Sequence, residues 1–100
     1  MKLGILVNTN KHLDDIRGIT KAAIAKCHTV NHFIMDDGTR LLSDPAFTEL
    51  CELEGVTMAF CDHSAEGMGT KVDGIPEKIA CGSQFDNATM NSASDKVIVL

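Results

Sequence analysis

The sequence predicts an α/β protein in which a parallel sheet of five strands carries helices on both faces. Short apolar runs alternate with amphipathic or polar segments along all 100 residues, which is the pattern of consecutive βα units. The first and last runs, KLGILV and KVIVL, lack the polar alternation of a half-exposed strand, so they fit strands buried on both faces. This length predicts one domain, residues 1–100. Strands are expected near residues 2–7, 29–35, 56–61, 78–81 and 96–100.

The first strand ends in a polar turn, residues 8–10, in which Thr9 or Asn10 can cap the helix that follows. Apolar residues then recur every three or four positions from about Lys11 to Lys26, which predicts an amphipathic helix. Gly18 interrupts this helix, and we expect it to allow close packing on the sheet.

The second strand contains His32, which we expect to be packed or at an edge rather than a ligand. The strand ends in the acidic turn Asp36-Asp37-Gly38. Asp44 followed by proline is a strong helix start, and Gly55 is a good C-terminal stop for that helix.

The segment Val56–Gly69, VTMAFCDHSAEGMG, is the part of the chain in which we expect chemistry. Cys61 is the last residue of its strand, and ligands collect at the carboxyl ends of strands in open parallel sheets. A helix start directly after Cys61 favours the thiolate, the reactive form of cysteine. The alternative is that Cys61 only packs in the core, as free cysteines often do.

The C-terminal part of the chain begins with a connection rich in turn residues, residues 70–77, before the short fourth strand. Ser83 and Asp86 have the spacing of a capping box. They predict a helix over about residues 84–93 that precedes the last strand.

The sequence contains four cysteines and no C-x-x-C pair, so neither a thioredoxin-type site nor a zinc knuckle has its usual signature. We expect four reduced thiols. Cys27 is interpreted as the last core position of the first long helix, and Cys51 lies on the apolar stripe of the next helix. Cys81 also ends a strand and is the competitor of Cys61 for reactivity.

Composition excludes several classes of partner. The formal charge is −5 and no basic cluster is present, which argues against nucleic acid and anionic membranes. No apolar run approaches the roughly 20 residues that span a bilayer, and the N-terminal apolar run is too short for a signal peptide. We therefore expect a cytoplasmic protein with no cofactor. So short a chain has a modest core, which favours self-association.

Four segments together resemble the DsrE/DsrF-like family of small sulfur-relay proteins. The resemblance covers nearly the whole chain and implies a three-layer α/β/α domain with a five-stranded parallel sheet that assembles as trimers or hexamers. It also implies that Cys61 accepts sulfane sulfur as a persulfide from a protein donor and passes it to a protein acceptor. The segments are KLGILVNTN, FIMDDGTRLL, CELEGVTMAFCDHSAEGMG and GSQFDNATMNSASDKVIVL.

The residues after Cys61 depart from the family pattern, in which small residues and Arg-Gly often follow the cysteine. Asp62 and Glu66 stand there instead and are expected to raise the thiol pKa, whereas a protonated His63 would lower it. Two alternatives to a carrier therefore remain open. One is a non-catalytic assembly subunit. The other is a metal or small-anion binder that uses Cys61, His63 and an acid from the turn after the second strand. The supporting site candidates are His63, Asn8, Asp36 and Asp37.

Overall fold

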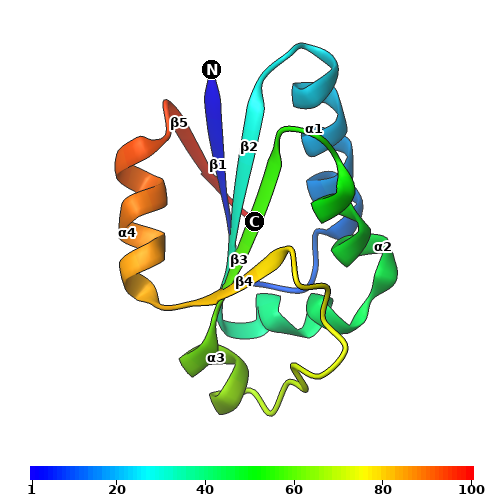
Figure 1. The fold of residues 1–100 in the computed structure, drawn as a ribbon, viewed down its shortest axis with the longest axis vertical. Coiled ribbons are helices and arrows are strands. Elements are labelled where there is room, and N and C mark those ends of the chain that lie inside the picture. The colour runs from blue at the N-terminus through cyan, green and yellow to red at the C-terminus, as the bar shows by residue number, and fades with distance from the viewer.

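The computed structural model describes all 100 residues and contains the predicted parallel sheet (Figure 1). The five strands lie in the order β4-β3-β2-β1-β5, and every neighbouring pair is parallel. Each strand lies within one residue of its predicted bounds, because turn residues flank every apolar run. The strands are β1 Lys2–Val7, β2 Thr29–Ile34, β3 Val56–Cys61, β4 Ile79–Gly82 and β5 Lys96–Val99.

Helices cover both faces of the sheet, which confirms the predicted layers. The prediction that the last strand is buried on both faces is wrong, because β5 is an edge strand and Val99 is 57% exposed. Figure 1 shows α4 on one side of the sheet and α1 and α2 on the other, with α3 beyond the carboxyl end of β3. No helix combines the length and the hydrophobicity that crossing a bilayer demands. The helices are α1 Leu13–Ala25, α2 Pro45–Thr48, α3 Asp62–Gly67 and α4 Gln84–Ala93, and two segments are 3₁₀ helices, η1 Asp36–Ser43 and η2 Glu49–Glu52.

The sheet divides the interior into two cores of unequal size. The larger core contains 16 buried residues between the sheet and the layer of α1, α2 and the 3₁₀ helices. The smaller core, on the α4 side, contains Phe33, Cys61 and Met90. Side chains alternate between faces along a strand, so Phe60 of β3 enters the larger core while Cys61 enters the smaller one.

The capping signals predicted for α2 and α4 are present. The Asp44 side chain accepts a hydrogen bond from the Ala46 backbone N–H at 2.9 Å at the start of α2, with proline at the first helical position. Ser83 and Asp86 form a full capping box on α4. Gly55 has a φ of 89°, which suits a residue without a side chain after a helical segment.

His32 is a packed histidine, as predicted. It is 2% exposed, and its Nε2 lies 2.9 Å from the hydroxyl of Thr20 on α1. Burial lowers the pKa of His32 to about 4 because the charged imidazolium loses its hydration in the core. The ring is therefore neutral at physiological pH.

Several predictions about the first half of the chain are wrong. Cys27 is exposed rather than a core position, because α1 ends at Ala25 and Cys27 leaves the helix with a φ of 65°. The residue before α1 is His12, which makes no side-chain cap, so neither Thr9 nor Asn10 caps it. Gly18 faces open space, with no atom within 4 Å of where its Cβ would be.

The acidic segment after β2 is not a simple turn. Residues 36–43 form the 3₁₀ helix η1. The backbone of this helix approaches the end of β1 closely, since a Cβ on Gly38 would lie 2.2 Å from the Val7 carbonyl oxygen. The helix predicted after Asp44 is also divided, into one turn of α-helix and the 3₁₀ helix η2.

Candidate functional site

Cys61 occupies the junction of β3 and α3. It is the last residue of β3 and, with φ −81° and ψ 114°, the extended N-cap residue of α3. Its side chain points to the α4 face and packs against Phe33 and Met90, which leaves it 2% exposed. The predicted position at a strand end is therefore confirmed, whereas the sulfur is covered rather than open to solvent.

The pKa of the Cys61 thiol is lower than that of an ordinary cysteine. Burial alone raises this pKa, because it disfavours the charged thiolate. Hydrogen bonds from the side chain and backbone of Ser64, from the side chain of Gln84 and from the backbone of His63 outweigh burial. Ser64 and His63 belong to the first turn of α3, where backbone N–H groups are free to meet a negative charge.

The side chains of Gln84 and Met35 meet beside this sulfur. The Nε2 of Gln84 lies 3.8 Å from the Sδ of Met35, and Met35 packs on the core that contains Cys61. Gln84 is exposed and Met35 is half-buried. Both side chains are long and unbranched, so each can adopt several rotamers.

The other thiols differ from Cys61. Burial and the neighbouring Glu52 raise the pKa of Cys51. Cys81 is exposed on the edge strand β4, and its pKa is raised by partial desolvation, by the Asp62 carboxylate and by the charge of Cys61. Of the cysteines with a shifted pKa, Cys61 alone is shifted toward the thiolate.

The acidic residues of α3 act differently from what the sequence predicts. Asp62 is exposed, and its carboxylate raises the pKa of the Cys81 thiol. Neither Asp62 nor Glu66 is among the groups that shift the pKa of Cys61. The exposed His63 acts through its backbone rather than its ring.

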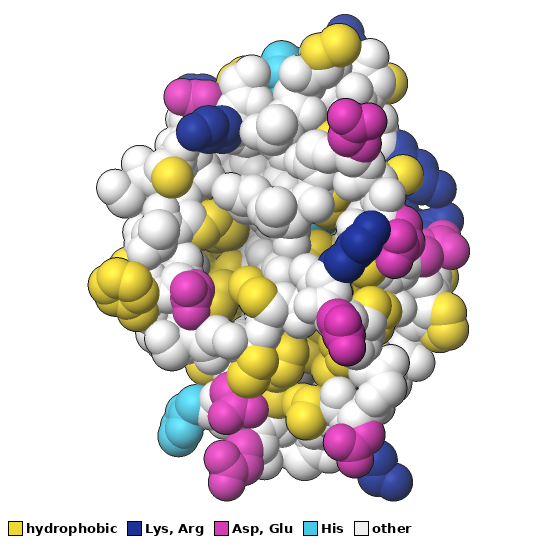
Figure 2. Space-filling model, in the orientation of Figure 1, with side chains coloured by type: hydrophobic (Ala, Val, Ile, Leu, Met, Phe, Trp, Pro, Cys, Tyr) yellow, Lys and Arg dark blue, Asp and Glu magenta, His cyan; other side chains and the backbone are white.

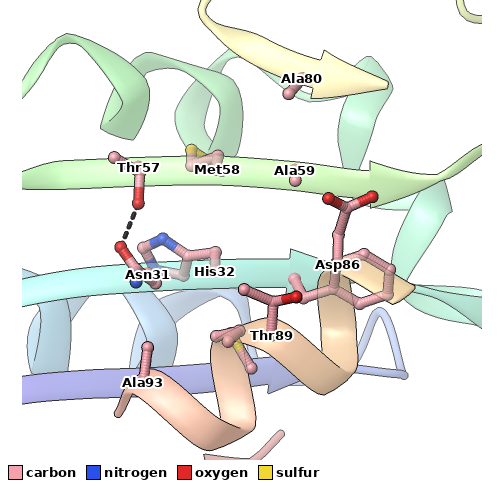
Figure 3. Close-up of a pocket in the computed structure, with 11 residues that line it drawn as sticks. Asn31, His32, Thr57, Met58, Ala59, Ala80, Asp86, Thr89 and Ala93 are labelled. Carbon is pink, nitrogen blue, oxygen red and sulfur yellow. Dashed lines mark hydrogen bonds between the residues drawn. The ribbon is translucent and has the colours of Figure 1, made fainter. Parts of the chain in front are cut away.

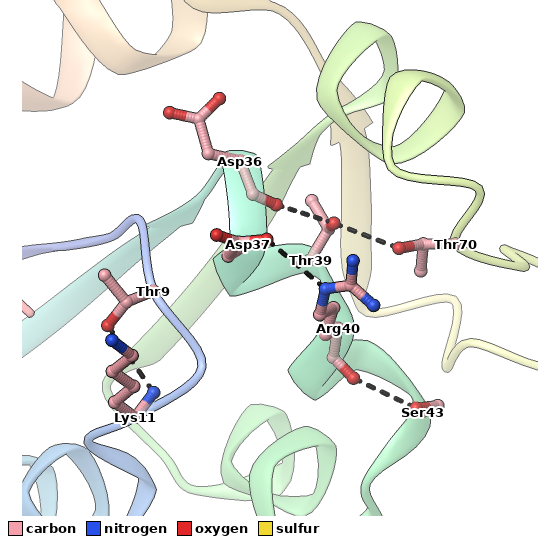
Figure 4. A network of polar contacts seen from close by, with 8 residues as sticks. All are labelled: Thr9, Lys11, Asp36, Asp37, Thr39, Arg40, Ser43 and Thr70. Atoms are coloured by element: carbon pink, nitrogen blue, oxygen red, sulfur yellow. Dashed lines mark hydrogen bonds and ion pairs between the residues drawn. The ribbon is translucent and has the colours of Figure 1, made fainter.

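The remaining predicted residues lie at the same edge of the sheet but do not contact the sulfur. Asp36 and Asp37 begin η1, and Asp37 pairs with Arg40 at 3.3 Å (Figure 4). Asn8 follows β1 and is half-buried. No three His, Cys, Asp or Glu side chains are close enough together to hold a metal ion, so the predicted ligands Cys61, His63 and an acid of η1 are not assembled.

A cleft of about 260 Å³ opens on the α4 face of the sheet (Figure 3). Phe33 and Met90 belong both to its lining and to the core that covers Cys61. Polar groups line the cleft too, since the Thr57 hydroxyl donates to the side-chain oxygen of Asn31. Figure 2 shows apolar side chains in the hollow beside α4 and acidic side chains gathered around α3. The cleft is therefore open to solvent and adjoins the residues that cover the Cys61 thiol.

Sequence reasoning missed the residues that tune the thiol. Ser64 lies three residues after Cys61, which is the spacing of an N-terminal cap, and this signal could have identified it. Gln84 reaches Cys61 because β3 pairs with β4 such that Cys61 lies opposite Gly82. That pairing register cannot be read from either segment alone.

The architecture defines a small α/β protein of the DsrE/YchN-like fold, in which a thiol with a lowered pKa lies at the carboxyl end of a strand next to the sheet edge. YchN from E. coli aligns over 100% of both chains, with a TM-score of 0.76 and 13% sequence identity. MTH1491 from Methanobacterium thermoautotrophicum, a protein of unknown function, aligns over 99% of this chain and 98% of its own, with a TM-score of 0.77 and 12% identity. No family model matches the sequence, and no curated protein does. The shared feature is therefore the fold.

Proposed function

We propose that this protein is a small sulfur carrier that accepts sulfane sulfur on Cys61 as a persulfide and passes it on. The observation that carries the proposal is the lowered pKa of the Cys61 thiol at the start of α3. A thiolate, not a thiol, is the nucleophile in such exchanges. The resemblance of the chain to small sulfur-relay proteins supports the same assignment.

The chemistry requires one nucleophilic sulfur and no redox cofactor. The Cys61 thiolate attacks the outer sulfur of a donor persulfide, and the bond between the two donor sulfurs breaks. The donor leaves as a thiolate, and Cys61 carries the terminal sulfur. A nucleophile of the acceptor then attacks that terminal sulfur and releases the Cys61 thiolate. Atoms and electrons balance in both steps.

The surroundings of Cys61 suit a carrier. Groups of Ser64, Gln84 and His63 stabilise the thiolate before loading and after release. The sulfur is 2% exposed, so little of it faces solvent before a partner binds. Donor and acceptor would approach from the α4 side of the sheet, where the cleft adjoins Phe33 and Met90. Both partners are proposed to be proteins, and the carrier to act as a homo-oligomer in the cytoplasm.

Intact-mass measurement after exposure to a small-molecule persulfide donor tests this function. We expect the wild type to gain the mass of one sulfur atom and Cys61→Ser to gain none. Cys51→Ser is the matched control, because it removes a buried thiol whose pKa is raised, and it should still gain one sulfur. If the wild type gains no sulfur, the near-complete burial of Cys61 favours the alternative, a non-catalytic assembly subunit.

A further inference from the structure

A second pocket lies between the 3₁₀ helix η1 and the segment that follows α3, and we call it the η1 pocket. Its volume is about 280 Å³. None of its lining residues belongs to the core that contains Cys61, so the candidate thiol site does not account for it. The lining residues are Arg40 and Ser43 of η1 and Met68, Gly69, Thr70 and Lys71 of the segment after α3.

The charge of the η1 pocket is opposite to that of the whole chain. The protein has a formal charge of −5, yet Arg40 and Lys71 line this pocket and no Asp or Glu does. The last carbonyl oxygens of α3 are not free here either, because the backbone N–H groups of residues 68–70 donate to them. Two positive charges that face one pocket repel each other, so a bound anion would lower their electrostatic energy.

Most N–H groups of these two residues are free to bind a ligand. Only the Nε of Arg40 is paired, at 3.3 Å from the carboxylate of Asp37. Figure 4 shows the two outer nitrogens of this guanidinium pointing away from Asp37, toward the side on which Thr70 lies. Lys71 forms no ion pair, and its backbone N–H donates to no group of the chain. A guanidinium with two free nitrogens and an ammonium are suitable donors for phosphate oxygens.

Hydrogen bonds hold the two walls of the η1 pocket in place. The buried Thr39 hydroxyl donates to the Asp36 carbonyl oxygen at 2.8 Å, so it accepts from the Thr70 hydroxyl at 3.0 Å (Figure 4). This pair joins η1 to the segment after α3. The Ser43 hydroxyl donates to the Arg40 carbonyl oxygen at 3.0 Å. Because both lining hydroxyls donate within the chain, the free donors of the pocket are the N–H groups.

We propose that the η1 pocket binds a phosphate group, either as the free ion or as the monoester of a small molecule. The outer nitrogens of Arg40 bind phosphate oxygens, and Lys71 neutralises a second negative charge. Ligand pockets begin at about 300 Å³, so a volume of about 280 Å³ leaves room for a small group attached to the phosphate. The inference does not depend on the proposed carrier function.

Titration of inorganic phosphate into the protein at constant ionic strength, with chloride as the anion replaced, tests the inference. Amide NMR should show saturable shifts confined to the η1 pocket, at Arg40 and at residues 69–71. A parallel titration with glycerol phosphate should shift the same amides. Tighter binding of glycerol phosphate identifies a monoester as the ligand, and equal or weaker binding identifies the free ion.

Three variants make the test specific. Arg40→Gln and Lys71→Gln each remove an exposed cation and should weaken phosphate binding by about fivefold or more. Lys96→Gln is the matched control, because it removes the same charge from β5, at the opposite edge of the sheet from β4. This control should bind phosphate like the wild type.

The carrier function and phosphate binding can fail separately. Cys61→Ser, which cannot carry sulfur, should bind phosphate like the wild type. Shifts spread over the whole surface, or equal weakening in Lys71→Gln and Lys96→Gln, would mean an adventitious ion only and would overturn the inference. A wild type without saturable binding would overturn it as well.

Discussion

Ser64 lowers the pKa of the Cys61 thiol through both its side chain and its backbone. The two residues are three positions apart, Cys61 at the N-cap and Ser64 in the first turn of α3. The side-chain bond of Ser64 is the largest of the effects that lower the thiol pKa. The local sequence CDHS thus places a thiol and the residue that lowers its pKa in one helical turn.

Removing the Ser64 hydroxyl should weaken the nucleophile. We expect Ser64→Ala to raise the pKa of Cys61 and to slow sulfur uptake at neutral pH by about threefold to tenfold, since one pKa unit is a factor of ten in thiolate. Persulfide formation followed by mass against time measures this rate. Ser43→Ala is the control, because its hydroxyl bonds only the Arg40 carbonyl oxygen at 3.0 Å. An equal loss of rate in both variants would contradict a specific role for Ser64.

His32 should make the fold sensitive to acid. Its pKa is about 4 in the folded state and about 6.5 in the unfolded chain, so the unfolded state binds a proton first as the pH falls. Stability should therefore decrease between pH 6.5 and 4, by about 3 kcal/mol from this residue, and not further below pH 4.

Urea unfolding at several pH values measures that contribution. His32→Leu fills the site with an apolar side chain that does not titrate. We expect its stability to fall less than that of the wild type over the same pH interval. The carboxylates titrate in both proteins and cancel in the comparison. Parallel stability curves for the two proteins would show that His32 does not contribute.

Replacing each of two glycines with alanine should change the stability of the protein in opposite directions. Gly38→Ala places a Cβ 2.2 Å from the Val7 carbonyl oxygen, so η1 must move away from β1, at a cost of about 3 kcal/mol. Gly18→Ala meets no atom within 4 Å in the exposed interior of α1 and should stabilise the protein by about 0.5–1 kcal/mol. Thermal unfolding of both variants checks this, and a neutral Gly38→Ala would show that the close approach of η1 to β1 is wrong.

The chain should associate with copies of itself. Only 25 of 100 residues are buried, which is a modest core for one domain. Phe85 on α4 is 78% exposed and Val99 on the edge strand β5 is 57% exposed, and association would cover such surface. Light scattering at micromolar concentration should give a mass of a trimer or hexamer, and Phe85→Ser should lower it. A monomer mass for the wild type would contradict this prediction.

The fold could be predicted from sequence because each strand is an apolar run between turn residues. Local signals such as Asp44-Pro45 and the Ser83–Asp86 capping box also predicted the starts of two helices correctly. The errors occur where tertiary contacts decide the local structure. Gly38 is typical of a turn. In the structure it lies in the 3₁₀ helix over residues 36–43, whose backbone closely approaches β1.

The site was only partly predictable for a related reason. The strand-end position of Cys61 follows from the sequence, but its burial depends on α4, which covers this face of the sheet. The sequence predicts that Asp62 raises the pKa of its neighbour Cys61, whereas it raises the pKa of Cys81 on β4 instead. Contacts between strands depend on pairing order and register, which short-range patterns do not contain.

The most direct measurement is the titration of the Cys61 thiolate itself. Ultraviolet absorbance reports thiolate without any reagent, so burial of the sulfur does not interfere. The difference between the pH titrations of wild type and Cys61→Ser isolates this one group in the folded protein. We predict a difference curve whose midpoint lies below that of an ordinary cysteine and moves upward in Ser64→Ala. A midpoint at or above the ordinary value would mean that burial outweighs the hydrogen bonds, and it would contradict an activated thiol at Cys61.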